Sequence, residues 1–201
     1  MKSSFKVTTF LFLVVGALLF SSKAQAQFQA NLMGNYLAPT ESGSSFSDGY
    51  WGGGATLRYF VKPNLAVGLN GRYFSQSNSA NFAFDPGAGL SGSAKASFNF
   101  LIVTGQAEYF FSTSALRPYV GLEAGLYRAA GTVEISNGYQ TFKESASSAD
   151  FGVAPKVGLQ YALSPSLGLN ADAGYHLIFG DGEIGKWLLL GAGVYFTFGQ
   201  K

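Results

Sequence analysis

The feature that most constrains the fold is an alternation of apolar residues with polar or small residues, which recurs in eight segments. A period of two is typical of β-strands, because successive side chains point to opposite faces of a sheet. In 191–198, for example, alanine, valine and phenylalanine alternate with glycine, tyrosine and threonine. The eight segments are 28–37, 53–61, 65–74, 98–110, 118–127, 151–161, 167–178 and 187–198. We therefore predict an all-β protein.

The connections between these segments alternate in length. The long ones lie near 38–52, 75–97, 128–150 and 179–186, and the short ones are 62–64, 111–117 and 162–166. An even number of strands, with short turns at one end and long loops at the other, is typical of outer-membrane barrels. We predict that 27–201 forms one eight-stranded, antiparallel, up-and-down transmembrane β-barrel whose long connections are extracellular.

The N-terminal segment 1–26 has the pattern of a secretory signal peptide. Lys2 and Lys6 precede an apolar run at 7–20, and Ala24-Gln25-Ala26 is a small-x-small cleavage site. A transmembrane anchor is the alternative, but the run is shorter than the about 20 residues that a helical span needs. We predict cleavage between Ala26 and Gln27. Three of the 13 basic residues lie in this segment, so the remaining chain is nearly neutral and no basic cluster indicates nucleic-acid binding.

Because alternate side chains of a strand point to opposite faces, the predicted sheet has one charged, glycine-rich face and one bulky, apolar face. Alternation alone leaves open which face is inside, and a soluble lipocalin-type barrel would carry the charges outside. Small residues with balanced charge suit the narrow lumen of eight strands, which side chains fill. We therefore predict an ion-pair network inside the barrel. Its six members, one on each of strands two to seven, are Arg58, Arg72, Glu108, Glu123, Lys156 and Asp172.

Aromatic residues on the apolar face gather at the two ends of the strands. Two such belts are the pattern expected at the two interfaces of a membrane. Tyr119 and Tyr127 depart from it, because they share the parity of the charges. The residues of the belts are Tyr36, Tyr73 and Tyr175 at one end, and Tyr59, Tyr109, Tyr161, Phe196 and Phe198 at the other.

The last strand also carries Gly193, Phe196 and Phe198, a spacing that resembles the C-terminal assembly signal of bacterial outer-membrane barrels. Gly199-Gln200-Lys201 follow, whereas the family pattern ends on the last aromatic residue. With the strand pattern, the chain resembles the small OmpA/OmpX-like barrels, and only their barrel domain. The resemblance implies the outer membrane of a two-membraned, Gram-negative bacterium, insertion by the barrel-assembly machinery, contact with lipid and lipopolysaccharide, and a monomer.

An enzyme is the main competing class, since some outer-membrane barrels modify lipid A. His176, the only histidine, shares the lumen face with Asp172, but Leu177 and Ile178 follow it. The His-x-Ser arrangement of the lipid A deacylases is therefore absent, and a histidine bonded into the lumen network is the preferred interpretation. With one histidine and no cysteine, no metal-ligand spacing occurs, so we expect no catalytic, cofactor or metal site.

Two long connections contain hairpin signals. Asn137-Gly138 lies between alternating runs, which predicts a two-residue turn that pairs Val133 with Phe142 and Ile135 with Gln140. Segment 75–100 has a weaker signal of the same kind. Strands three to six would then project beyond the membrane as a sheet with free edges. We expect a non-enzymatic surface protein, structural or adhesive, that binds a partner through these hairpins; a lipid A-modifying enzyme and a narrow pore are the alternatives.

Overall fold

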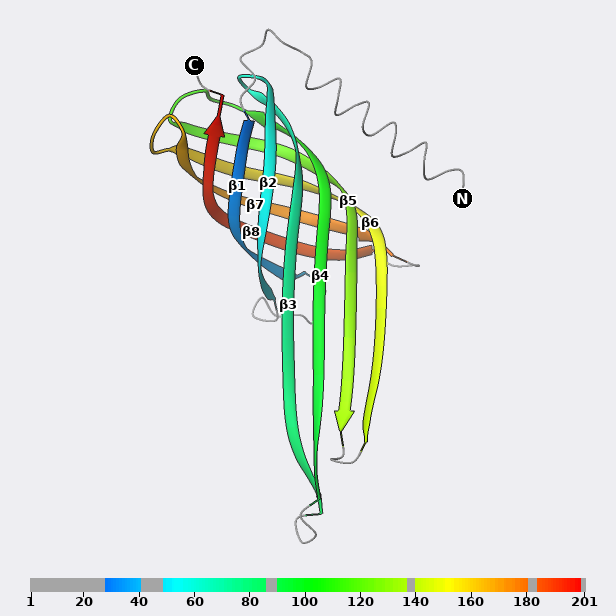
Figure 1. Cartoon of the computed structure of the whole chain (residues 1–201). Helices are drawn as coiled ribbons and strands as arrows, with labels where there is room; N and C mark the ends of the chain where they lie inside the picture. Colours follow the sequence, from blue (N-terminus) through cyan, green and yellow to red (C-terminus); the bar gives the residue numbers. More distant parts are fainter. Residues whose placement is uncertain (1–27, 41–48, 86–89, 137–139, 181–183, 200–201) are drawn as a thin grey trace.

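The computed structural model describes residues 28–40, 49–85, 90–136, 140–180 and 184–199, and within them eight strands close into an antiparallel barrel (Figure 1). Each strand pairs with the next along the chain, and the last pairs with the first. The predicted signal peptide, with its cleavage site at Ala26 and Gln27, lies outside the described residues. The strands are β1 (Phe28–Pro39), β2 (Tyr50–Lys62), β3 (Leu65–Asp85), β4 (Leu90–Phe110), β5 (Leu116–Ser136), β6 (Thr141–Ala162), β7 (Leu167–Phe179) and β8 (Ile184–Phe198).

The eight predicted strands, their antiparallel order and the closure of the barrel are confirmed. Every predicted segment lies within an observed strand. The seam between β1 and β8 runs from the pair Phe28 and Phe198 to the pair Pro39 and Trp187, so neither strand keeps a free edge there. No helix among the described residues is long and apolar enough to cross a membrane.

Four of the strands are much longer than predicted. β3 to β5 have 21 residues each and β6 has 22, against 12 to 15 for β1, β2, β7 and β8. The connections expected at 75–97 and 128–150 are therefore mostly strand, as the hairpin signals indicated. We call the four-stranded sheet formed by 75–85, 90–99, 128–136 and 141–150 the extension; it projects far beyond the barrel in Figure 1.

The predicted pairing at the tip of the β5–β6 hairpin is wrong by two residues. Val133 pairs with Glu144, and Ile135 pairs with Phe142. The reason is that the last pair is Ser136 with Thr141, which leaves four residues in the connection where a two-residue turn was expected. Asn137-Gly138 lies outside the described residues. A shift of two keeps every side chain on its predicted face.

The barrel is polar inside and apolar outside. Leu57, Leu69 and Leu122 are each more than half exposed on the outer wall. The alternation of burial along each strand therefore places the charged face inward, which is the reverse of a soluble lipocalin-type barrel. All eight belt aromatics lie on the outward parity, and the two exceptions, Tyr119 and Tyr127, are buried in the interior as their parity predicts.

Candidate functional site

The barrel interior holds a continuous chain of ion pairs. Arg58 on β2 binds Glu108 on β4 through two guanidinium nitrogens, with Nη2 2.9 Å from Oε1. Arg72 on β3 binds Glu123 on β5 in the same two-pronged way, at 2.7 and 2.9 Å. Lys156 on β6 joins the two pairs, because its Nζ lies 2.6 Å from Glu108 and 3.0 Å from Glu123. Five of the six predicted residues thus form one connected cluster.

These five side chains are almost fully withdrawn from solvent, with 1–5% of their surface exposed. A buried charge needs a partner, because the low-dielectric interior does not solvate it. The alternation of the strands brings the charges inward, and the register brings opposite charges level with each other. The cluster therefore ties five of the eight strands together across the lumen.

Asp172 on β7, the sixth predicted residue, joins the cluster indirectly. Its Oδ2 accepts a hydrogen bond from the Tyr119 hydroxyl at 3.2 Å. The same hydroxyl oxygen lies 3.2 Å from Nη2 of Arg58. Tyr119, whose side chain lies on the same face as the charges, therefore links the Asp172 carboxylate to the ion pairs. The sequence did not indicate this role.

Uncharged polar residues of the lumen were missed, because only ionisable residues were selected from the sequence. Strand parity is the signal that finds them, since they alternate with the outward apolar residues. Several polar atoms among them have no hydrogen-bond partner among the described residues, including both amide atoms of Asn31. The buried members are Gln29, Asn31, Asn35, Thr56, Asn70, Thr104, Gln106, Gln160 and Asn170.

Apolar layers lie on both sides of the charged layer. Toward the extension, Phe74, Phe100 and Tyr127 form a buried cluster with aliphatic residues, and Trp187 packs against it. Toward the short turns, Phe60 and Phe110 pack with Tyr119. The lumen is thus filled by layers of side chains, as expected for eight strands.

His176 lies in the part of this interior nearer the extension, beside Tyr127, and is 1% exposed. Its Nδ1 is 2.7 Å from the hydroxyl of Tyr127, so a phenol occupies the ring nitrogen that the orienting carboxylate of a Ser-His-Asp triad would take. This agrees with the interpretation of His176 as part of the lumen network. Among the described residues, no group of three or more His, Cys, Asp or Glu side chains could hold a metal ion.

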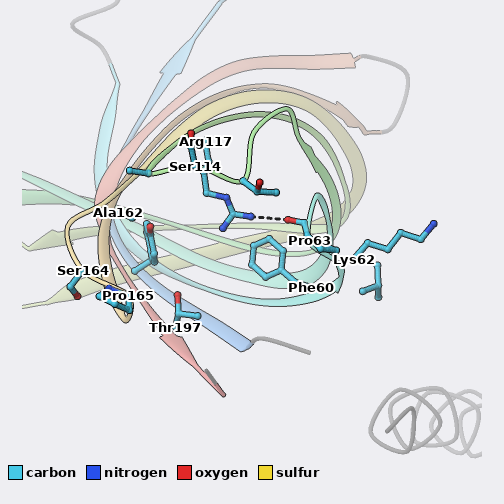
Figure 2. Close-up of a pocket in the computed structure, with 13 residues that line it drawn as sticks. Phe60, Lys62, Pro63, Ser114, Arg117, Ala162, Ser164, Pro165 and Thr197 are labelled. Carbon is cyan, nitrogen blue, oxygen red and sulfur yellow. Dashed lines mark hydrogen bonds between the residues drawn. The ribbon is translucent and has the colours of Figure 1, made fainter. Parts of the chain in front are cut away.

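A pocket of about 630 Å³ opens at the short-turn end of the barrel (Figure 2). Arg117 donates a hydrogen bond to the Pro63 carbonyl at 2.9 Å, and its guanidinium lies over the rings of Phe60 and Phe110. In Figure 2 the side chain of Lys62 points away from the pocket. Two backbone carbonyls and two rings thus hold the Arg117 guanidinium in place at this end of the lumen.

The residues of the predicted assembly signal occupy both faces of β8. Phe196 and Phe198 project outward near the short-turn end. Gly193 lies against β1, where an added Cβ would collide with the Leu32 carbonyl oxygen and lie 2.7 Å from the Met33 Cα. Glycine is therefore required at the seam for the two backbones to approach this closely.

The extension leaves two strand edges without a neighbouring strand among the described residues. β2 pairs with β3 only as far as Phe74, and β7 pairs with β6 only from Phe151. The edges at 75–85 and 141–150 are therefore free. Near the tip, Lys143 on β6 lies 2.8 Å from Glu134 on β5, and its hydrogen bond lowers the pKa of the Glu134 carboxyl.

Comparisons with known proteins bear on this geometry. The sequence matches the outer membrane protein beta-barrel domain family over residues 10–198. Among curated proteins, none matched it. Neisserial surface protein A (NspA) is 15% identical, with a TM-score of 0.51, and the match covers 86% of this chain and 97% of that one. A major outer membrane protein of Thermus thermophilus is 16% identical, with a TM-score of 0.53 and coverages of 86% and 99%.

Proposed function

This chain belongs to the outer membrane protein β-barrel domain family, and we propose that it is a non-enzymatic surface protein that binds a partner through the extension. The family model covers the barrel and the extension alike. The filled lumen and the outward apolar wall serve to hold the protein in the membrane. The extension is the part that is free to contact molecules outside the membrane.

The free edges of the extension are the observation that carries this proposal. An edge strand presents a row of unpaired backbone N–H and C=O groups, which an extended chain can bind by adding a strand. The β6 edge is ten residues long, 141–150, and the edge on the opposite side of the sheet, on β3, runs from 75 to 85. Natural proteins usually protect such edges, so two long ones on the same sheet favour a binding role.

An apolar tip lies beside the β6 edge. Val133 and Ile135 on β5 and Phe142 on β6 share one face of the sheet, and they are 49%, 46% and 66% exposed. Exposed apolar side chains next to a free edge give an added strand side-chain contacts as well as backbone hydrogen bonds. The proposed partner is therefore a polypeptide that binds in an extended conformation.

Shortening the β5–β6 hairpin tests the proposal. Replacing 133–144 by Asn-Gly joins Thr132 to Ser145, which already face each other in the sheet with hydroxyl oxygens 3.0 Å apart. The variant should assemble normally and lose adhesion of expressing cells or capture of partner proteins. A triple variant, Val133→Thr, Ile135→Thr and Phe142→Thr, keeps the edge and removes the apolar tip, so it separates the two contributions.

Two other outcomes would replace the proposal. If shortening the hairpin left binding unchanged while the purified protein modified lipid A, an enzyme would be the better description. If the purified protein conducted ions in bilayers, a narrow pore would be the better description. The proposed orientation places the extension outside a two-membraned bacterium and the short turns in the periplasm.

A further inference from the structure

The pocket at the short-turn end of the barrel is lined by all three short connections (Figure 2). Pro63 lies between β2 and β3, Ser114 between β4 and β5, and Pro165 between β6 and β7. Thr197, near the end of β8, also lines the pocket. The volume of about 630 Å³ lies within the range of sites that bind small organic molecules. Segments far apart in the sequence thus form one site, at the opposite end of the barrel from the extension.

Arg117 brings a positive charge to this pocket that no carboxylate neutralises. Its Nε and Nη2 donate hydrogen bonds to the backbone carbonyls of Ser112 and Pro63, at 3.4 and 2.9 Å. Nη1 has no acceptor, and the guanidinium has no ion pair, among the residues that the structure describes. The arginines deeper in the barrel differ, because Arg58 and Arg72 each hold a glutamate. Buried charges in proteins are normally paired, so this site favours an anion.

The guanidinium of Arg117 is also held in a fixed position. Its central carbon lies 4.9 Å from the centre of the Phe60 ring and 4.7 Å from the centre of the Phe110 ring. Because two carbonyls bind it as well, the side chain has little freedom left to lose when an anion binds. Ordering a long side chain is one of the costs of association, so this preorganisation favours binding.

Two hydroxyl groups of β8 line the same pocket. Tyr195 is only 3% exposed, and its hydroxyl has no hydrogen-bond partner in the described part of the chain. Buried polar groups almost always have a partner, so this hydroxyl is suited to a ligand. Thr197 accepts a hydrogen bond from Nε2 of Gln29 at 3.4 Å and keeps its own hydrogen to donate. The pocket thus offers one guanidinium and two hydroxyl donors.

This set of donors selects a ligand with a single negative charge. A carboxylate carries one charge and accepts hydrogen bonds from guanidinium and hydroxyl groups. A phosphate monoester carries about 1.5 to 2 charges and needs more than one cation. Lys62, the only other cation among the described residues of the lining, points away from the pocket in Figure 2. The charge of the site therefore matches a carboxylate better than a phosphate.

The rest of the lining fits the end of a peptide. Val61, Ala162 and Pro165 supply an apolar wall, and Thr113 adds a further hydroxyl. Because the pocket opens at the end of the barrel, a bound chain can continue outward. We propose that the pocket binds the C-terminal carboxylate of a polypeptide, which contacts Arg117 and the Tyr195 hydroxyl. In the orientation given under Proposed function this end faces the periplasm, so the ligand is a periplasmic polypeptide.

Removal of the Arg117 charge tests the proposal, with Lys62 as a matched control. Arg117→Gln and Lys62→Gln each remove one cation from the short-turn end, but the Lys62 side chain points away from the pocket. Tyr195→Phe removes only a hydroxyl without a partner among the described residues, so its unfolding in urea should match that of wild type. The full chain in nonionic detergent micelles is titrated by calorimetry with N-acetyl-dialanine, with the C-terminal amide of this peptide, and with inorganic phosphate.

Wild-type protein should bind N-acetyl-dialanine more tightly than the amide or phosphate, and added salt should weaken this binding. Arg117→Gln and Tyr195→Phe should each bind it about tenfold more weakly, the change expected for one hydrogen bond to a charged group. Lys62→Gln should bind like wild type.

Three results would overturn the proposal: equal binding of the acid and the amide, tighter binding of phosphate, or undiminished binding by Tyr195→Phe. Equal weakening by Lys62→Gln and Arg117→Gln would also contradict it, because the effect would then be one of net charge. The variant with the shortened β5–β6 hairpin retains this pocket, so its peptide binding reports on the inference separately from the proposed function.

Discussion

Replacing Glu123 by glutamine should destabilise the barrel strongly. The carboxylate accepts two hydrogen bonds from Arg72, at 2.7 and 2.9 Å, one from Thr104 at 3.0 Å, and it pairs with Lys156 at 3.0 Å. The amide keeps the shape but removes the charge, so two buried cations lose an anion. Breaking a buried ion pair by removing one partner costs about 3–5 kcal/mol. We expect the free energy of unfolding to fall by that amount.

The measurement is urea unfolding of the refolded protein in detergent micelles or lipid vesicles, followed by tryptophan fluorescence. Trp187, which packs against the buried cluster near the extension, is a suitable reporter. The control is Glu134→Gln, which removes a partly exposed carboxylate that also has a lysine partner, and its unfolding curve should overlay that of wild type.

A double variant distinguishes loss of the pair from loss of one charge. Replacing Arg72 by methionine and Glu123 by leucine removes both charges, and Lys156 keeps Glu108 at 2.6 Å. An apolar pair of similar volume is often neutral in stability, so this variant should unfold closer to wild type than Glu123→Gln does. If Glu123→Gln unfolded like wild type, the buried cluster would not stabilise the barrel and the reasoning would fail.

Two further predictions concern the seam and the lumen. Gly193→Ala should lower the unfolding free energy by about 1–3 kcal/mol, because the new methyl group collides with the β1 backbone. The control is Gly71→Ala, whose added Cβ has nothing within 4 Å. It should unfold at the same urea concentration as wild type, or at a higher one. Purified wild-type protein in planar bilayers should give no stable unit conductance, because buried aromatic layers lie in the lumen on both sides of the ion pairs; regular single-channel steps would contradict this.

The sequence was sufficient for most of the barrel because one physical rule applies along every strand. A membrane-spanning barrel must alternate lipid-facing and lumen-facing residues, so parity placed Arg58, Glu123 and Lys156 on one face. The small residues and balanced charge of that face then indicated that it lines the lumen. The same rule would have identified buried amides such as Gln160, had uncharged residues been considered.

Other features depended on information that the alternation does not contain. The order of partners within the ion-pair cluster depends on register and on side-chain length, so the bridging position of Lys156 between two arginine–glutamate pairs was not predictable from parity. The pairing at the β5–β6 tip was wrong because the connection is longer than the turn that the Asn-Gly signal suggested.

Thiol labelling of intact cells tests the account most directly, because the sequence has no cysteine and any label reports on an introduced one. Ser145→Cys places a thiol on the extension, and Ser114→Cys places one in a short turn at the other end of the barrel; both serines are exposed. A membrane-impermeant maleimide should label Ser145→Cys in intact cells, and Ser114→Cys only after the outer membrane is permeabilised. Labelling of Ser114→Cys alone in intact cells would show that the extension points inward, and labelling of neither site would contradict its exposure at the surface.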